Sequence, residues 1–229
     1  MKSKIQMLVK SLMVMSLLTL FFSCSKKVKD ASDNEYDVVK IGGQCWLKQN
    51  LRTTKYNDGA DIPTDETVDW ENGTVGAYAI YQDKKYPNKV KNEAKYGKLY
   101  NWHSVNTGKL APKGWHVATD ADWDKLDKFL GHLNAGIKLK AKHSWQKDIV
   151  GMGTDETGFS ALPGGDRSVG GGTSGSMGQN ALFWTSKSMG VTDNKSYPIN
   201  YTMTYNVPNI TQEMRYKPNF GMSVRCVKD

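Results

Sequence analysis

The segment PKGWHVATDADWDKLDKFLG, which runs from Pro112 to Gly131, predicts a strand followed at once by a helix. Residues 115–117 are predicted to form the short strand. Thr119 and Asp122 have the spacing of a capping box, so the helix should begin directly after Thr119. Gly131 is suited to end it. Four apolar residues recur at helical spacing between these ends: Trp123, Leu126, Phe129 and Leu130.

A helix with one apolar face needs a sheet to pack against, and the rest of the chain is predicted to supply the strands. Six extended segments are expected: 36–41, 45–51, 76–81, 182–186, 199–207 and 222–227. Residues 96–107 are ambiguous, and the spacing of their apolar residues favours a short helix over a strand. The connecting segments should be irregular: 53–69, 83–95, 135–145 (strand or arm) and the glycine-rich 151–178. This pattern predicts one α+β domain over residues 37–229.

The N-terminus has the pattern of an export signal. Lysines precede an apolar run at residues 12–22, and the small residue Ser23 follows it. The run is shorter than the ~20 residues that a membrane-spanning helix needs, so residues 1–23 are predicted to be a signal peptide. The sequence Phe21-Phe22-Ser23-Cys24 resembles the lipobox of bacterial lipoproteins. This resemblance implies that Cys24 carries acyl chains such as palmitate and anchors the protein, whereas the alternative is an ordinary signal with Cys24 as a bystander.

A lipid-anchored, exported chain is expected in the cell envelope, at the outer membrane. Residues 24–36 are polar and lack an apolar pattern, so they are predicted to be a flexible tether. The basic residues after Cys24 favour contact with anionic headgroups and a periplasmic rather than a surface-exposed position. Of the 31 basic residues three lie in the signal, which leaves 28 against 23 acidic ones. So small an excess argues against nucleic acid as a partner.

Two further cysteines, Cys45 and Cys226, lie near the two ends of the predicted domain. Export permits a disulfide between them, and the alternative is a pair of buried thiols. We favour the disulfide because the first and last strands of the domain are expected to be neighbours. Closing so long a loop would stabilise the fold by about 4–5 kcal/mol on a chain-entropy basis.

No catalytic, metal or cofactor site is recognisable in the sequence. The four histidines are scattered, and the aspartates at 120, 122 and 124 lack the glycine and the final acid of a calcium loop. The glycines at 170–175 match a dinucleotide-binding pattern, but no strand precedes them and no apolar helix follows. The chain is therefore not expected to be an enzyme or to hold a metal or cofactor.

Tryptophan and tyrosine are enriched, with 7 and 11 residues, and such rings can fill a core or stack on sugars. Four tryptophans lie in predicted strands or on the helix stripe and are assigned to the core: Trp46, Trp115, Trp123 and Trp184. Trp70 and Trp145 lie in irregular segments and are the better candidates for exposure. Trp145, with Asp166 and Arg167 in the glycine-rich loop, is the expected ligand-binding set. The alternative for Asp166 and Arg167 is a local ion pair.

Six blocks of the chain occur in an order that resembles a known family: 42–54 (GGQCWLKQNLRTT), 96–102 (YGKLYNW), 112–123 (PKGWHVATDADW), 157–167 (TGFSALPGGDR), 183–186 (FWTS) and 221–227 (GMSVRCV). They are similar to the Fibrobacter succinogenes major paralogous domain, which is common in lipoproteins of Bacteroidetes and Fibrobacteres. That family usually has a cysteine where this chain has Ala111. The departure leaves Cys45 with Cys226 as the one pairing that the resemblance allows.

The same blocks are more distantly similar to the formylglycine-generating enzyme and to C-type lectin-like folds. This similarity implies short twisted β-sheets, two helices and long irregular loops. Neither activity carries over. The enzyme relies on a cysteine pair in its last third, where this chain has only Cys226, and the calcium-binding triplets of sugar-binding lectins are missing.

These observations together predict a membrane-anchored envelope lipoprotein with a non-catalytic domain that binds a glycan or a protein. Two alternatives stay open. An enzyme with an unrecognised site would show polar side chains that converge in a pocket around a strongly perturbed titratable group. A structural subunit of a surface assembly would show a large exposed apolar patch.

Overall fold

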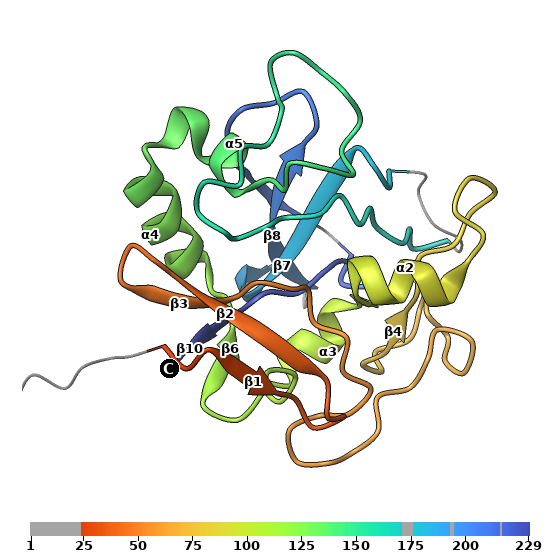
Figure 1. Ribbon diagram of the computed structural model, residues 1–229. Helices are drawn as coiled ribbons and strands as arrows, with labels where there is room; N and C mark the ends of the chain where they lie inside the picture. Colours follow the sequence, from red (N-terminus) through yellow and green to blue (C-terminus); the bar gives the residue numbers. More distant parts are fainter. Residues whose placement is uncertain (1–23, 171–175, 193–194, 216) are drawn as a thin grey trace, which may run out of the picture.

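Five short strands from both ends of the chain form the main sheet. The computed structural model describes residues 24–170, 176–192, 195–215 and 217–229. Its main sheet consists of β1 (Lys27–Lys29), β2 (Glu35–Ile41), β3 (Gln44–Leu47), β6 (Trp115–Val117) and β10 (Cys226–Lys228). The strand order is β1-β2-β3-β10-β6, and every neighbouring pair is antiparallel (Figure 1). Because β3 lies beside β10, the two ends of the domain are neighbours, as the sequence predicts.

The remaining strands form two smaller sheets. β4 (Tyr78–Ala79) pairs with β5 (Leu99–Tyr100). β7 (Asn180–Thr192), β8 (Lys195–Thr204) and β9 (Thr211–Met214) form an antiparallel sheet in that order. A bridge between Phe183 and Ser223 joins β7 to the segment that leads into β10. Helices and mostly antiparallel sheets are thus combined in one fold, which agrees with the predicted α+β class.

The helices exceed the two that the sequence predicts. They are α2 (Lys89–Tyr96), α3 (Trp102–Asn106), α4 (Asp120–Leu130) and α5 (Ala135–Leu139), with a 3-10 turn η1 (His132–Asn134) after α4. The region 96–107 divides into β5 and α3 instead of forming a single helix. α2 lies in a region expected to be loop, because it buries only Asn92 and Tyr96 and has no apolar stripe. Its start is stabilised by Asn88, whose side chain accepts a hydrogen bond from the Lys91 amide at 2.9 Å.

Helix α4 confirms the predicted capping box. Thr119 Oγ1 accepts a hydrogen bond from the Asp122 amide at 3.1 Å, and Asp122 Oδ2 accepts one from the Thr119 amide at 2.9 Å. Gly131 ends the helix in the left-handed region, with φ at +83°. Phe129 does not belong to the buried apolar face that the sequence predicts for this helix, because its side chain is 62% exposed. Its ring lies over Gly42, where a Cβ would come within 2.6 Å of the ring.

Alternate residues of β3 face two different cores. Trp46 faces the core beneath α4, where its ring centroid is 5.1 Å from that of Trp123. Cys45 and Leu47 face the second core. All four tryptophans assigned to the core are buried. Trp70, which the sequence places among the exposed residues, is only 4% exposed and is therefore a correction to that prediction.

Arg225 is buried just before β10 and joins three parts of the fold. Its Nε donates to Asn50 Oδ1 at 2.8 Å, and its Nη1 donates to the carbonyls of Leu47 and Phe159, each at 2.8 Å. Its Cζ lies 4.2 Å from the centroid of the Phe159 ring. The guanidinium therefore holds the end of β3 to the loop that carries Phe159 and Ser160.

The segment predicted to be a flexible tether is ordered from Cys24 onwards, so this prediction is wrong. β1 pairs with β2 in the register Lys27 opposite Asp37. The turn between the two strands is closed by the buried Asp30 carboxylate, which accepts hydrogen bonds from the amides of Ser32 and Asn34 at 2.8 and 3.0 Å. The polar residues that suggest disorder in the sequence thus satisfy one another in a tight turn.

The predicted disulfide between Cys45 and Cys226 is also wrong. Cys45 is bonded to Cys24, with the two Cα atoms 5.8 Å apart, and Cys226 is a buried free thiol. Cys45 and Cys226 do lie on neighbouring strands, but Val227 is opposite Trp46, so Cys226 is opposite Leu47 and diagonal to Cys45. A diagonal pair is about 7–8 Å apart at Cα, which is too far for a disulfide.

Residues 1–23, predicted to be a signal peptide, lie outside the described residues. Within the described residues, no helix has both the length and the apolar composition needed to cross a membrane.

Candidate functional site

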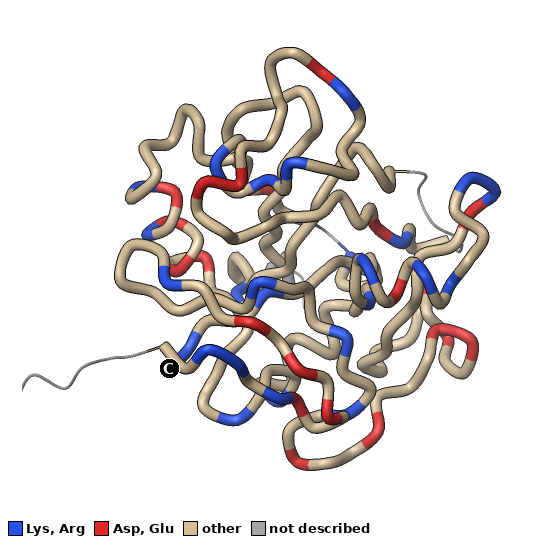
Figure 2. Tube along the Cα trace, viewed as in Figure 1, with Lys and Arg blue, Asp and Glu red and all other residues tan. Residues whose placement is uncertain are grey.

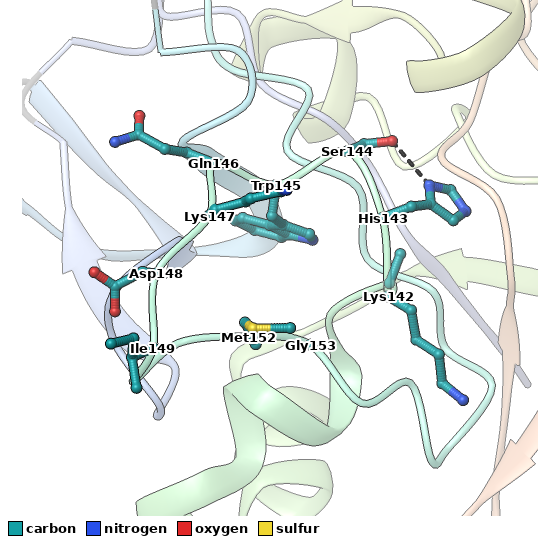
Figure 3. Close-up of a pocket in the computed structure, with 11 residues that line it drawn as sticks. Lys142, His143, Ser144, Trp145, Gln146, Lys147, Asp148, Ile149, Met152 and Gly153 are labelled. Atoms are coloured by element: carbon teal, nitrogen blue, oxygen red, sulfur yellow. Dashed lines mark hydrogen bonds between the residues drawn. The ribbon is translucent and has the colours of Figure 1, made fainter.

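A cavity of about 550 Å³ lies within the loop of residues 141–153, which follows α5. Figure 3 shows that the loop folds back on itself around the indole of Trp145, with Met152 on the returning arm. The lining combines apolar side chains with polar and charged ones: Lys142, His143, Ser144, Trp145, Gln146, Lys147, Asp148, Ile149 and Met152. A concave site of this size that combines apolar and polar side chains is typical of small-ligand binding.

The loop is fixed to the rest of the fold at three points by backbone contacts. The amide of Ala141 donates to the carbonyl of Ala161 at 2.9 Å, and that of Gln146 donates to the carbonyl of Gly178 at 2.6 Å. Gly151 lies so close to the next segment that a Cβ would be 1.9 Å from the Tyr205 carbonyl oxygen. Only glycine fits at this position, so the glycine that suggests a loop in the sequence is needed for close packing.

Lys140, which precedes the loop, is fully buried. Its Nζ donates to the carbonyls of Gly151, Thr204 and Val207 at 3.1, 2.5 and 2.7 Å. Burial lowers the pKa of Lys140 to about 8, and the negative charge of Asp148 acts in the opposite direction. The ammonium thus ties the returning arm of the loop to the end of β8 and to the segment after it.

Trp145 is half-buried, and its indole is held in place by contacts with Ala161 and Lys140. Nε1 donates to the carbonyl of Ala161 at 3.0 Å, and Lys140 Nζ lies 5.2 Å from the ring centroid. Ile149 and Met152 are 97% and 63% exposed at the rim. In Figure 3 the side chains of Gln146 and Asp148 lie on the outer side of the loop. The site therefore offers a fixed aromatic ring and apolar contacts, with polar groups around them.

Asp166 and Arg167 are not brought together with Trp145. Arg167 is buried, with Nε 3.0 Å from Asp65 Oδ2 and Cζ 4.3 Å from the centroid of the Trp70 ring. Asp166 accepts a hydrogen bond from Ser176 Oγ at 2.5 Å. Arg167 therefore buries Trp70 and ties separate segments together, which leaves Trp145 as the predicted site residue that lines the cavity.

A second polar cluster surrounds His116 at the edge of the main sheet. Its Nε2 is 3.0 Å from Asp122 Oδ2, and its Nδ1 is 2.7 Å from Asp229 Oδ1. The hydrogen bond to Asp122 is the largest of the effects that raise the pKa of His116. Burial alone would raise the pKa of Asp122, but hydrogen bonds from His116 and Thr119 outweigh it and lower the pKa to about 2. With a carboxylate on each ring nitrogen, this histidine connects β6 to α4 and to the residue after β10.

Among the described residues, no group of three or more His, Cys, Asp or Glu side chains could hold a metal ion. The functional residue that sequence reasoning misses is Lys140. It lies in the run Lys138-Leu139-Lys140-Ala141-Lys142, which is typical of a solvated lysine-rich surface. The positions on either side, Leu139 and Ala141, are buried too, but nothing local marks the lysine between them as buried.

A comparison with protein-family models matches residues 39–228 to the Fibrobacter succinogenes major domain. The match covers most of the chain and confirms the resemblance carried by the six sequence blocks. No curated protein and no solved structure matches the chain.

Proposed function

The chain belongs to the Fibrobacter succinogenes major domain family, and on that premise we propose that it is a cell-envelope lipoprotein whose folded domain binds a ligand and catalyses no reaction. We assign the fold to the C-type lectin-like and formylglycine-generating-enzyme-like group. The pairing of β3 with β10 supports this assignment, as do the long irregular segments between α5 and β7. In such a fold, loops on a rigid sheet scaffold are the usual place for recognition.

The proposed binding function rests on one observation: the indole of Trp145 is held in a fixed position in the open cavity of loop 141–153. An aromatic face is an apolar platform on which a sugar ring can stack. Gln146 and Asp148, on the outer side of the same loop, supply hydrogen-bonding groups next to the cavity. The indole hydrogen bond to Ala161 holds the ring in one orientation before the ligand arrives, which reduces the entropy lost on binding. We therefore propose a glycan as the ligand.

The exposed rim favours a protein as the second candidate ligand. Ile149, Val150 and Met152 are 97%, 61% and 63% exposed and follow one another closely in the chain. Adjacent exposed apolar side chains are a feature of protein-binding surfaces. If the ligand is a protein, Ile149→Asp should abolish its binding, because the new carboxylate would be buried against the bound protein.

We further propose that Cys24 carries the lipid anchor at the outer membrane, on its periplasmic face. This proposal rests on the signal pattern and the lipobox at residues 21–24. The sulfur of Cys24 can hold the lipid thioether or the bond to Cys45, but not both. Lipidation would therefore leave Cys45 as a thiol, 7% exposed in the second core.

Trp145→Ala should weaken glycan binding about tenfold, which corresponds to about 1.4 kcal/mol for the lost stacking. The measurement is a glycan-array screen followed by calorimetry, with the chain from residue 24 carrying Cys24→Ser. Phe129→Ala is the matched control, because Phe129 is an exposed aromatic residue on α4. It should bind as the unchanged chain does.

Two results would contradict this proposal. If the unchanged chain binds no glycan on the array, the ligand class is wrong, and pull-down with Ile149→Asp as the control then tests the protein ligand. If Trp145→Ala binds as tightly as the unchanged chain, the site lies elsewhere. Arg167→Ala should lower the unfolding midpoint with little effect on binding by the folded fraction, because Arg167 contacts Asp65 and Trp70.

A further inference from the structure

The proposed anchor residue lies close to the edge strand of the main sheet in sequence, and its Cα is 5.8 Å from that of Cys45 in β3. Only Ser25 and Lys26 separate Cys24 from β1. The carbonyl of Lys26 accepts a hydrogen bond from the Val38 amide at 3.1 Å, so the chain is held to β2 even before β1 begins. These contacts involve the backbone and do not depend on the bond between Cys24 and Cys45. A lipid on Cys24 would therefore emerge from a fixed point on the domain rather than from a free tether.

The edge strand at this point is basic. Lys26 and Lys29 are exposed, and Lys27 pairs with Glu35 of β2. Figure 2 shows the basic residues gathered along β1, next to the end of the chain. Near an anionic bilayer each lysine contributes about 1 kcal/mol of attraction. β1 is also the outermost strand of the five-stranded sheet, so one of its two edges pairs with no other strand of that sheet.

The binding loop lies at the opposite end of the molecule. In Figure 1 the strand β1 is at the bottom of the view, and the loop that follows α5 extends to the top. In this view β2, β3 and β7 lie between them. A separation seen in projection is a lower limit to the true separation, so the cavity of loop 141–153 cannot lie beside the anchor.

We propose that the β1 edge, Lys26 to Lys29 with Cys24, rests on the headgroups of an anionic bilayer and that the loop 141–153 points away from the membrane. This inference rests on the proposed lipid anchor. It means that the lipidated domain has a preferred orientation, with its binding cavity presented to ligands in the aqueous space instead of to lipid.

Energy transfer from two matched positions to a lipid dye tests the orientation. The lipidated protein, carrying Cys45→Ala, is labelled at Ala31→Cys or at Met152→Cys, both of which are exposed positions. Cys226 should stay unlabelled because it is fully buried and burial raises the pKa of its thiol. In vesicles of phosphatidylcholine and phosphatidylglycerol with an acceptor lipid, we expect the donor at position 31 to be quenched several-fold more than the donor at 152.

A glycine–serine spacer inserted after Ser25 is the control, because it restores a flexible tether and should reduce the difference between the two positions. Equal quenching without the spacer, or stronger quenching at 152, would overturn the orientation while leaving the anchor intact. A chain that carries no lipid and does not partition into vesicles would overturn the anchor and the orientation together. Lys26→Glu with Lys29→Glu should weaken the preference, and an unchanged preference would exclude headgroup attraction as its cause.

Discussion

Arg225→Met is expected to destabilise the domain by about 4 kcal/mol, a large part of the roughly 5–15 kcal/mol that stabilises an ordinary domain. Arg225 is 1% exposed and donates to Asn50 Oδ1 and to three backbone carbonyls. A methionine fills much of the space but donates no hydrogen bond, so these buried acceptors would be left without a partner. Urea unfolding followed by circular dichroism measures the loss as a lower midpoint at an unchanged slope.

Two further variants make this result specific. Arg225→Lys keeps the charge, but one ammonium cannot reproduce the separate donors Nε, which reaches Asn50, and Nη1, which reaches Leu47 and Phe159. The stability of Arg225→Lys should therefore fall between those of Arg225→Met and the unchanged chain. Arg52→Met is the control, because the guanidinium of Arg52 is only partly buried and should cost less than about 1 kcal/mol. An Arg225→Met midpoint equal to that of Arg52→Met would show that the buried network contributes nothing.

Lys140→Met is expected to cost about 3 kcal/mol and to abolish binding at the loop. The substitution leaves the carbonyls of Gly151, Thr204 and Val207 without the ammonium that they share. The returning arm of the loop would then lose its tie to the segment after β8. Lys142→Met is the matched control, because Lys142 is exposed in the same loop and should change stability by less than about 0.5 kcal/mol.

The pH dependence of the same variant gives a second readout. Burial lowers the pKa of Lys140 to about 8, from an ordinary value of 10.5. Between pH 8 and pH 10.5 the Lys140 side chain is mostly protonated in the unfolded chain and mostly neutral in the folded chain. Because the unfolded state binds more protons, Lys140 should make the free energy of unfolding increase as the pH rises through this range. The stability difference between the unchanged chain and Lys140→Met should therefore increase from pH 8 upwards. A difference that is constant over this window would contradict the lowered pKa.

Local signals predict parts of this fold well, because their physical cause lies within a few residues. The capping box of Thr119 and Asp122 and the C-terminal glycine of α4 depend only on neighbours in the chain. The four core tryptophans follow from the apolar character of the strands and the helix stripe. The family itself can be recognised because its blocks are short, ordered and spread over most of the chain.

The errors concern contacts between residues that are far apart in the sequence. Trp70 is buried because Arg167, nearly a hundred residues later, covers its ring. Cys226 cannot form a disulfide with Cys45 because the register of β3 and β10 places Cys226 opposite Leu47. Lys140 looks like a surface lysine until the end of β8 and the segment after it supply two of its three carbonyl partners. None of these partners can be assigned from spacing alone.

The candidate site can be predicted only in part, because most of its contacts also join residues that are far apart in the sequence. Trp145 could be chosen because it lies outside the predicted strands and helices, and it lines the cavity. Asp166 and Arg167 have the composition of a recognition loop, but their partners are Ser176 and Asp65. The ordered start of the chain was missed because the hydrogen bonds that Asp30 accepts make a polar segment fold without apolar burial.

The most direct test is the mass of the peptide that contains Cys24, measured on protein purified from the membrane fraction after alkylation of free thiols. We predict that Cys24 is the first residue, that it carries a diacylglyceryl thioether and an N-acyl chain, and that Cys45 is recovered alkylated. A peptide in which Cys24 is joined to Cys45 by a disulfide, or one that continues through Ser23, would contradict the proposed lipoprotein and the membrane orientation that rests on it.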